Sequence, residues 1–367
     1  MSHLLRWATF VSLAGAVCLL NAAPALAKTF HVHPGQSIQA AINAAKPGDK
    51  IIVDAGVFHE NLVITKDRLE LEGAGPGATV LVTPATPNPV PPQCGSSTVF
   101  HGICVAGAFD AAGNPGDPVK GDEIEGFSVL GFPGFGILDL NAKNSTVEDV
   151  EAAGNASYGI SGALLNGIRY FGNVAHDNGE PGIYVGDSPR AHAVVIGNTS
   201  YHNGVGGPEG FGFLFRDSSY GIVRNNNAHD NCAGFVFADT GENPVPAEHW
   251  HAGHNVSTHN TGSCTGEAGG PPPTSGIGFL LLGTHDSKLS DSTATGNVPT
   301  GPSIASGGII LWSSAAAGGS VPIKNTIEGN SAHDNAPFDI QWDGTGSRNK
   351  FKHNDCDTSS PSWICNS

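Results

Sequence analysis

Two short motifs alternate along most of the chain, and each has the spacing of apolar and polar residues expected near a short strand. The first is a glycine followed by an apolar residue, with another apolar residue two positions later in most copies, as in Gly212, Phe213 and Phe215. This period of two is typical of a strand with one buried face. Copies begin at Gly136, Gly159, Gly182, Gly212, Gly234, Gly278 and Gly308. The shortest intervals between them indicate a unit of 22 or 23 residues that insertions lengthen in some turns.

The second motif is a pair of asparagines five residues apart. Complete pairs stand at Asn173 and Asn178, Asn198 and Asn203, Asn226 and Asn231, Asn255 and Asn260, Asn330 and Asn335, and Asn349 and Asn354. Asn155 and Asn297 keep only the second asparagine. Three residues before the second asparagine the chain has alanine or serine in every copy except the last, which has Phe351. The chain therefore contains an internal repeat of strands and asparagine-containing turns.

A repeat of this length predicts stacked units. A unit of about 22 residues cannot bury its own apolar face, so neighbouring units must stack. Stacked copies of one strand lie parallel and about 4.8 Å apart, which brings identical residues into columns. Asparagine suits such a column, because its amide bonds to the copies above and below and to the turn backbone. A leucine-rich repeat would show leucines at fixed offsets, and a propeller blade needs about 40 residues. We therefore predict an all-β fold, the right-handed parallel β-helix.

The chain ends predict export and a capped β-helix. Residues 1–27 contain a basic start, an apolar run too short for a membrane span, and a small-x-small cleavage signal, which is the order of a signal peptide. Residues 28–355 form the expected β-helix, and residues 356–367 form a tail closed by a disulfide. Apolar residues at 38, 41, 42 and 45 predict a short amphipathic helix that caps the N-terminal opening. We expect a monomer, secreted to the periplasm or the cell exterior, without a membrane anchor.

Composition and charge agree with this class. The 51 glycines and the low fraction of charged residues, 14%, favour strands and turns over helices. The formal net charge of −16 excludes the basic surface needed to bind nucleic acid. An even number of cysteines outside the signal segment of an exported chain indicates disulfides. We favour pairing between nearest neighbours: Cys94 with Cys104, Cys232 with Cys264, and Cys356 with Cys365.

The repeat region resembles a known superfamily. Residues 33–42, 48–53 and 56–60 and the segment Leu71-Glu72-Gly73 resemble the opening coil of the pectate-lyase-like superfamily. The glycine–apolar and double-asparagine units resemble its parallel β-helix repeats, so the resemblance covers nearly all of residues 29–355. It implies the fold. It leaves the activity open, because the superfamily includes polysaccharide lyases, epimerases, hydrolases, copper-site maturation proteins and surface proteins.

Alignment of the units brings three aspartates into one column. Asp187, Asp217 and Asp239 each stand five residues after the glycine of their unit and precede a hydroxyl residue. Stacked carboxylates repel one another, so one must hold a proton or a cation must lie among them. The resemblance implies calcium, because such aspartates bind calcium or act as acids in members that cleave acidic polysaccharides. The alternative is a turn in which each carboxylate caps its own backbone.

Several arginines lie in the same part of the chain. Arg216 precedes Asp217 on the outward face of its predicted strand, and Arg190 and Arg224 are near in sequence. A β-elimination on a uronic acid needs a cation at the substrate carboxylate and a base for the proton at C5. We expect Arg216 and Asp217 to be catalytic, with Arg190 and Arg224 in contact with substrate. Alternatively, Arg216 only pairs with the aspartates.

Histidine and tyrosine recur just before the second asparagine of the units. Tyr201 and His202 precede Asn203, and His229 occupies the position of Tyr201 in the next unit. An outward row of such groups suits proton transfer, because histidine titrates near neutral pH. Most of the row must be structural, since it spans more units than one site needs. We expect His202 or Tyr201 to transfer protons, and Tyr184 and Trp312 to stack on sugars.

Together these features predict a secreted enzyme that acts on an acidic polysaccharide by β-elimination or C5 epimerisation, with calcium as the candidate cofactor. The chain has no family-specific catalytic motif such as the Asp-Pro-His-Glu of alginate epimerases. The alternative function is a non-catalytic β-helix that binds a glycan, a protein partner or copper. His249 and His251, on one face of a strand, are the candidate copper ligands.

Overall fold

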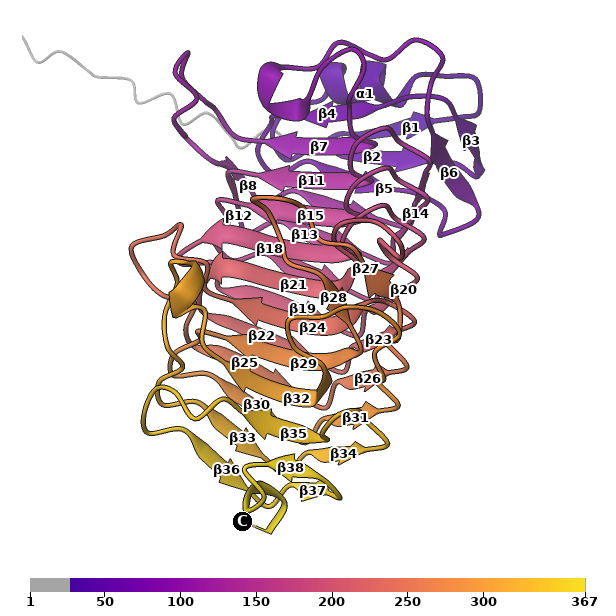
Figure 1. Cartoon of the computed structure of the whole chain (residues 1–367). Coiled ribbons are helices and arrows are strands. Elements are labelled where there is room, and N and C mark those ends of the chain that lie inside the picture. Colours follow the sequence, from indigo (N-terminus) through magenta and orange to yellow (C-terminus); the bar gives the residue numbers. More distant parts are fainter. Residues whose placement is uncertain (1–26, 367) are drawn as a thin grey trace, which may run out of the picture.

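The chain forms a right-handed parallel β-helix, as the repeat predicted (Figure 1). The computed structural model describes residues 27–366, so the predicted signal peptide lies outside the described residues except for its last position. Most coils contribute three strands, and successive coils stack into three long sheets of 12, 11 and 11 strands. We call these sheets 1, 2 and 3 in the order in which the chain visits them. A short helix, α1 (Ile38–Ala44), lies at the N-terminal end.

The strands of each sheet pair in parallel with their counterparts in the next coil. Sheet 1 contains β1 (Thr29–Val32), β2 (Lys50–Val53), β5 (Glu70–Glu72), β9 (Glu123–Glu125), β13 (Thr146–Glu148), β16 (Arg169–Phe171), β19 (Ala193–Ile196), β22 (Gly221–Arg224), β25 (Trp250–Gly253), β30 (Lys288–Ser290), β33 (Thr326–Glu328) and β36 (Lys350–Lys352). Sheet 2 contains β3 (Gly56–Phe58), β6 (Thr79–Val82), β10 (Ser128–Leu130), β14 (Glu151–Ala153), β17 (Val174–His176), β20 (Thr199–Tyr201), β23 (Asn227–His229), β26 (Val256–Thr258), β31 (Thr293–Thr295), β34 (Ser331–His333) and β37 (Asp355–Cys356). Sheet 3 contains β4 (Leu62–Ile64), β7 (Ile103–Ala106), β11 (Ile137–Leu140), β15 (Ile160–Ala163), β18 (Ile183–Ser188), β21 (Phe211–Ser218), β24 (Ala233–Ala238), β29 (Ile277–Leu282), β32 (Gly307–Trp312), β35 (Ile340–Trp342) and β38 (Ser359–Ser360).

The remaining elements are short and lie in turns or insertions. They are the strand pairs β8 (Val119–Lys120) with β12 (Ala142–Lys143) and β27 (Ser263–Cys264) with β28 (Thr274–Ser275), and the 3-10 turns η1 (Pro92–Cys94), η2 (Ala315–Ala317) and η3 (Ile364–Asn366).

Columns of apolar side chains fill the interior of the β-helix. In sheet 3 the residue after each repeat glycine points inward, and Phe213, Phe235 and Phe279 stack with ring centroids 4.5 and 4.9 Å apart. The glycine lies where the coils approach most closely, because a Cβ at Gly212 would lie 2.8 Å from the carbonyl oxygen of Gly234. The glycine–apolar motif therefore combines a close contact between coils with an inward side chain.

The asparagines form buried ladders along the helix axis. The side-chain amide of Asn173 donates to Oδ1 of Asn198 at 3.0 Å, and that of Asn198 donates to Oδ1 of Asn226 at 2.9 Å. Each amide also donates to a backbone carbonyl of the preceding coil. The second asparagines of the pairs form another ladder, from Asn155 to Asn335. Residues one unit apart therefore touch, which confirms the stacking predicted from the repeat.

The row of histidines and aspartates beside the second ladder follows from backbone geometry. The residue before the ladder asparagine has a positive φ, between 51° and 59°, in Asp177, His202, Asp230, His259 and Asp334. Apart from glycine, it is mainly Asn, Asp and His that enter this left-handed region. The turn therefore selects these residue types, and their periodicity carries no information about catalysis.

Two aspartates interrupt the apolar interior. Asp122 and Asp139 are 1% and 0% exposed. Asp122 accepts a hydrogen bond from the backbone N–H of Leu69, and Asp139 accepts one from the hydroxyl of Ser145, but the second oxygen of each carboxylate has no hydrogen-bond partner. Burial raises the pKa of Asp122 to about 8 and that of Asp139 to about 6. Both carboxyl groups therefore hold their protons well above the usual pH range of an aspartate.

Both ends of the β-helix are covered. Ser37 caps the N-terminus of helix α1, where its side chain accepts a hydrogen bond from the N–H of Ala40, and the helix buries Ile38 and Ile42 against the first coil. At the other end, η3 packs beside the disulfide of the tail. The disulfides join the same cysteines as the nearest-neighbour pairing: Cys94 with Cys104, Cys232 with Cys264, and Cys356 with Cys365. Between residues 27 and 366 the structure contains no helix that could serve as a membrane span.

Candidate functional site

A groove of about 440 Å³ crosses the outer face of sheet 3 over β21, β24, β29 and β32. Its floor includes Leu214, Val236 and Leu280, which face outward in register on three successive coils. Its walls are loops that leave the coil, some of them drawn in orange in Figure 1, and they contribute Pro271 and Ile304. The same insertions lengthen the repeat in this part of the chain, so the groove lies where the repeat is least regular.

Arg216 is the one cation among the described residues that line this groove. Its side chain is 31% exposed, with Nη2 3.7 Å from Oε2 of Glu242 and 4.0 Å from Oδ2 of Asp187, and Nε 3.8 Å from Oδ2 of Asp217. These distances exceed those of hydrogen bonds, and the buried Nε has no hydrogen-bond partner. The guanidinium group therefore lies among carboxylates but retains donors for a ligand.

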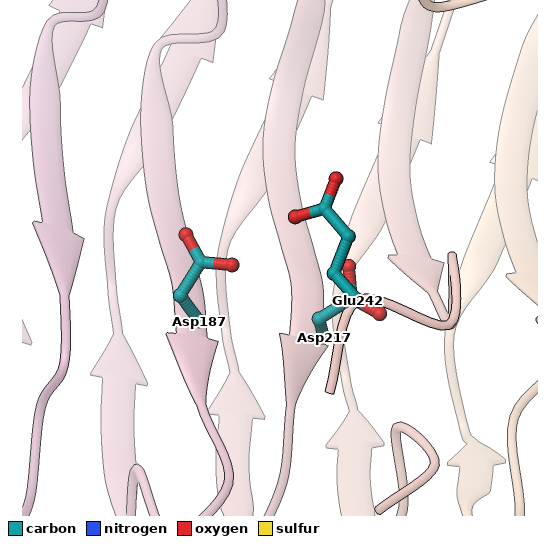
Figure 2. A group of neighbouring side chains, drawn as sticks. All are labelled: Asp187, Asp217 and Glu242. Carbon is teal, nitrogen blue, oxygen red and sulfur yellow. The ribbon is translucent and has the colours of Figure 1, made fainter. Parts of the chain in front are cut away.

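Three carboxylates lie within 4.0 Å of the Arg216 guanidinium group, and Figure 2 shows how they lie relative to one another. Asp187 comes from β18, Asp217 from β21 and Glu242 from the loop after β24, and one oxygen of each lies within 4.8 Å of the others. Asp217 is fully buried and accepts hydrogen bonds from the backbone N–H of Thr240, at 2.8 Å, and from its hydroxyl group. Burial raises the pKa of Asp187, and Arg216 opposes this shift. The three carboxylates offer the oxygen ligands that calcium prefers. Arg216 competes with a calcium ion for these oxygens.

Glu209 adds a titratable group to the same end of the groove. It precedes β21, and burial raises its pKa to about 7, against the opposing effects of Arg216 and of a hydrogen bond with Tyr158. Tyr158 stacks on Tyr184 with ring centroids 5.0 Å apart, and burial raises the pKa of both phenols. Near neutral pH, Glu209 therefore exchanges a proton while both tyrosines stay protonated.

Sequence reasoning missed Glu209 and Glu242. Neither residue belongs to the repeat: Glu209 lies in the insertion before Gly212, and Glu242 lies in the long interval after Gly234. Loops on a regular scaffold often carry functional residues. The insertions themselves were therefore the signal that could have found both glutamates.

Other predicted site residues lie on other faces of the β-helix. Tyr201 ends β20 in sheet 2 and His202 follows it, whereas Arg224 ends β22 in sheet 1. Since Arg216 faces outward from sheet 3, the prediction that one site combines it with Tyr201, His202 and Arg224 is wrong. Arg190 is exposed in the turn between β18 and β19 and does not line the groove.

The structure gives Tyr201 and His229 a packing role. The Tyr201 ring lies between those of His176 and His229, with centroid distances of 4.7 and 4.9 Å and nearly parallel planes. The imidazoles of His176 and His229 are each 2.7 Å from the carboxylate of the following aspartate. This stack belongs to the outer surface of sheet 2 and has no contact with the groove.

Two members of the predicted set lie in sheet 3, and one of them differs from expectation. Tyr184 is buried between Tyr158 and the guanidinium group of Arg216, whose Cζ is 5.7 Å from the Tyr184 ring centroid. It therefore has no free face for a sugar, and it packs against Arg216 instead. Trp312, by contrast, lines the groove and is partly exposed.

Asp239 is not part of the carboxylate cluster. It is buried, and its Oδ1 accepts a hydrogen bond from the backbone N–H of Gly241 at 3.1 Å, as in the turn alternative. The prediction that Asp239 completes a cation site with Asp187 and Asp217 is wrong, because Glu242 takes that place.

The candidate copper ligands lie outside the group of three potential metal ligands found in the described residues. The ring of His249 stacks on Tyr220 at 4.8 Å, and its Nε2 lies 3.7 Å from Glu248, whereas His251 lies in β25. In the described part of the chain, three potential ligands converge only at Asp187, Asp217 and Glu242. Neither histidine belongs to that group, so the structure gives no support to copper binding.

Comparison with known proteins agrees with the architecture. The family model described as "right handed beta helix region" matches residues 136–332, and the chain belongs to this family. Among solved structures, the A-module of the mannuronan C-5 epimerase AlgE4 of Azotobacter vinelandii is similar, with a TM-score of 0.55, 18% identity, and coverage of 88% of this chain and 90% of the module. The A-module of the epimerase AlgE6 of the same organism gives a TM-score of 0.50, 16% identity, and coverage of 88% and 94%.

A tailspike protein is also similar in fold. The Dettilon tailspike protein gives a TM-score of 0.52 at 13% identity, over 88% of this chain and 66% of the tailspike chain. A search of curated protein sequences found no significant match. At these identities the similarities establish the fold of the chain, and its chemistry must be argued from the groove.

Proposed function

We propose that this protein is an exported enzyme that acts on an acidic polysaccharide in the groove of sheet 3, by β-elimination or C5 epimerisation. The observation that carries the proposal is Arg216, the single cation among the described residues that line the groove, whose side chain is 31% exposed and whose Nη2 is 3.7 Å or more from the neighbouring carboxylates of Glu242 and Asp187. A carboxylate ligand is the natural partner of such a guanidinium group. The fold similarity to two mannuronan C-5 epimerases supports the same class of substrate. The three disulfides suit an oxidising compartment.

Both reactions begin with loss of the proton at C5 of a uronic acid. Arg216 neutralises the adjacent carboxylate, which stabilises the negative charge that develops when the proton leaves. Glu209 accepts the proton, because its pKa of about 7 leaves it partly ionised at neutral pH. In elimination the electron pair forms the C4–C5 double bond, the C4–O bond breaks and the leaving oxygen is protonated. In epimerisation a proton returns to the opposite face of C5. A calcium ion held by Asp187, Asp217 and Glu242 would supply further positive charge at the carboxylate.

Exchange at C5 tests the proposal for both reactions at once. The protein is incubated in D2O with a panel of uronate-containing polysaccharides, with calcium and with a chelator, and deuterium at C5 is followed by NMR. Ultraviolet absorbance of unsaturated ends then separates elimination from epimerisation. We expect exchange with at least one polymer and its loss in Arg216→Gln and Glu209→Gln, whereas Arg224→Gln on sheet 1 should retain it. Absence of both exchange and unsaturated ends with every polymer would overturn the proposal.

A second candidate function is glycan binding without turnover. The apolar floor of the groove favours this function, because the floor has no titratable groups and offers a contact surface for sugars. This function predicts that a polymer binds, that Arg216→Gln weakens binding, and that no deuterium enters the polymer.

A further inference from the structure

Charge is distributed unevenly along the groove. Its charged lining residues are Glu209, Arg216 and Glu242, and all three lie at the end formed by β21 and the loop after β24. The remaining lining residues, toward β32, are neutral, and most of them are apolar. The groove therefore has one charged end and a long neutral portion.

The neutral portion continues an in-register column on the outer face of sheet 3 that begins at Arg216. Arg216 pairs with Ala238, Ala238 with Leu282, and Leu282 with Trp312. Three strand spacings separate the first residue from the last, which amounts to about 14 Å. Beside this column run Leu214, Val236 and Leu280, also without polar side chains. A sugar chain that extends along the axis from Arg216 to Trp312 thus crosses an apolar floor.

This distribution discriminates between polymers by the spacing of their carboxylates. A carboxylate over Arg216 gains a charged partner. A second carboxylate over Ala238 or Leu282 would lose water without gaining a hydrogen-bond donor from a side chain of the floor, which is costly. A neutral sugar at the same position buries its C–H face on Leu282 or on the Trp312 ring at no such cost.

We infer that the groove takes a heteropolysaccharide in which an acidic residue is flanked on the Trp312 side by neutral residues, and that it disfavours homopolymers of uronic acid. This inference rests on the proposed function and narrows its substrate class. Arg216 binds the single carboxylate, and the portion from Ala238 to Trp312 binds the neutral residues. The loops that carry Pro271 and Ile304 enclose that portion from the sides.

Graded removal of carboxylates from one backbone tests the inference. Polygalacturonate and alginate are each reduced to different extents, so that carboxyl groups become hydroxymethyl groups while the backbone stays the same. Binding of each preparation is measured by isothermal titration calorimetry at one salt concentration. We expect the tightest binding at partial reduction, about tenfold tighter than that of the fully charged polymer. The fully reduced polymer should bind weakly, because Arg216 then lacks its partner.

A charge placed in the neutral portion provides the matched test. Leu282→Lys adds a cation two coils from Arg216, and it should raise the affinity for the fully charged polymers about threefold at low ionic strength. Leu282→Gln, which adds a neutral polar group, should leave the affinity for the fully charged polymers unchanged. Tightest binding of the fully charged polymers by the wild-type protein overturns the inference and leaves the proposed function standing. Failure of every preparation in both series to bind overturns the proposed function itself.

Discussion

Three consecutive asparagines offer a test of the ladder within one turn. Asn225 has a φ of 56° and is exposed, Asn226 belongs to the buried ladder, and Asn227 lies in β23 with an Oδ1 that has no hydrogen-bond partner. Substitution by alanine therefore removes a residue suited to the left-handed region at position 225, the ladder hydrogen bonds at position 226 and a side-chain oxygen without a hydrogen-bond partner at position 227. We expect the loss of stability to be largest for Asn226→Ala, intermediate for Asn225→Ala and smallest for Asn227→Ala.

The magnitudes follow from the contacts. The Asn226 side chain donates to Val195 and Asn255 at 2.9 and 3.0 Å, and accepts twice from Asn198 at 2.9 Å. Four hydrogen bonds at about 1 kcal/mol each predict a loss of about 4 kcal/mol. The left-handed conformation predicts about 1 kcal/mol for Asn225→Ala, and the free side chain predicts less than about 0.5 kcal/mol for Asn227→Ala.

Urea unfolding followed by far-ultraviolet circular dichroism measures the free energy of unfolding of all three variants. Asn225→Gly serves as a control for the backbone effect, since glycine adopts a positive φ freely, and it should be nearly neutral. If Asn226→Ala and Asn227→Ala lose similar stability, the ladder does not hold the coils together as the structure implies.

Three further predictions concern the interior, the proton acceptor and a groove loop. The folded pKa of Asp122 is raised to about 8, so the wild-type protein should lose stability as pH rises from about 4, the unfolded pKa, to about 8. Asp122→Asn should remove this loss, which amounts to up to about 5 kcal/mol at pH 8. A difference in unfolding free energy between wild type and Asp122→Asn that does not change with pH would contradict the prediction. The C5 exchange rate of the wild-type protein should rise with pH through about 7, and Glu209→Gln should lower this rate about a hundredfold or more. Glu267 is an exposed glutamate in the loop that contributes Pro271, and Glu267→Gln should keep the wild-type pH profile. Replacement of both Cys232 and Cys264 by alanine should lower the free energy of unfolding by about 3 kcal/mol and weaken ligand binding, because their disulfide anchors the loop that contributes Pro271. Removal of the Cys356–Cys365 disulfide should leave ligand binding unchanged. Equal effects of the two changes on ligand binding would refute the anchoring role.

The repeat made the neighbours along the helix axis predictable. Asn173, Asn198 and Asn226 were expected to touch because a unit of this length must stack, and the amide ladder joins them. The same alignment brought Asp187 and Asp217 together. Stacking is a translation along one axis, so a period read from the sequence converts directly into contacts.

The direction in which a residue faces was not predictable in the same way. Tyr201 and Arg216 are near in sequence, but a coil turns through three sheets between equivalent positions, and these two residues leave it on different faces. The recurrence of histidine or aspartate at the position of His202 was misleading for another reason, because the left-handed turn selects these residue types. Glu209 and Glu242 were missed because insertions follow no period, and their paths depend on contacts with distant coils.

The proposed role of Arg216 is to bind the carboxylate of a substrate in the groove of sheet 3. The most direct measurement is a double-mutant cycle between the protein and its ligand, using calorimetry on wild-type protein and Arg216→Gln, each with an acidic oligosaccharide that binds in the groove and with its carboxyl-reduced counterpart. We expect that reduction of the ligand weakens its binding to the wild-type protein but hardly affects its binding to Arg216→Gln, with a coupling energy of about 2 kcal/mol. If the two changes weaken binding independently, so that their effects add, Arg216 is not the partner of the carboxylate.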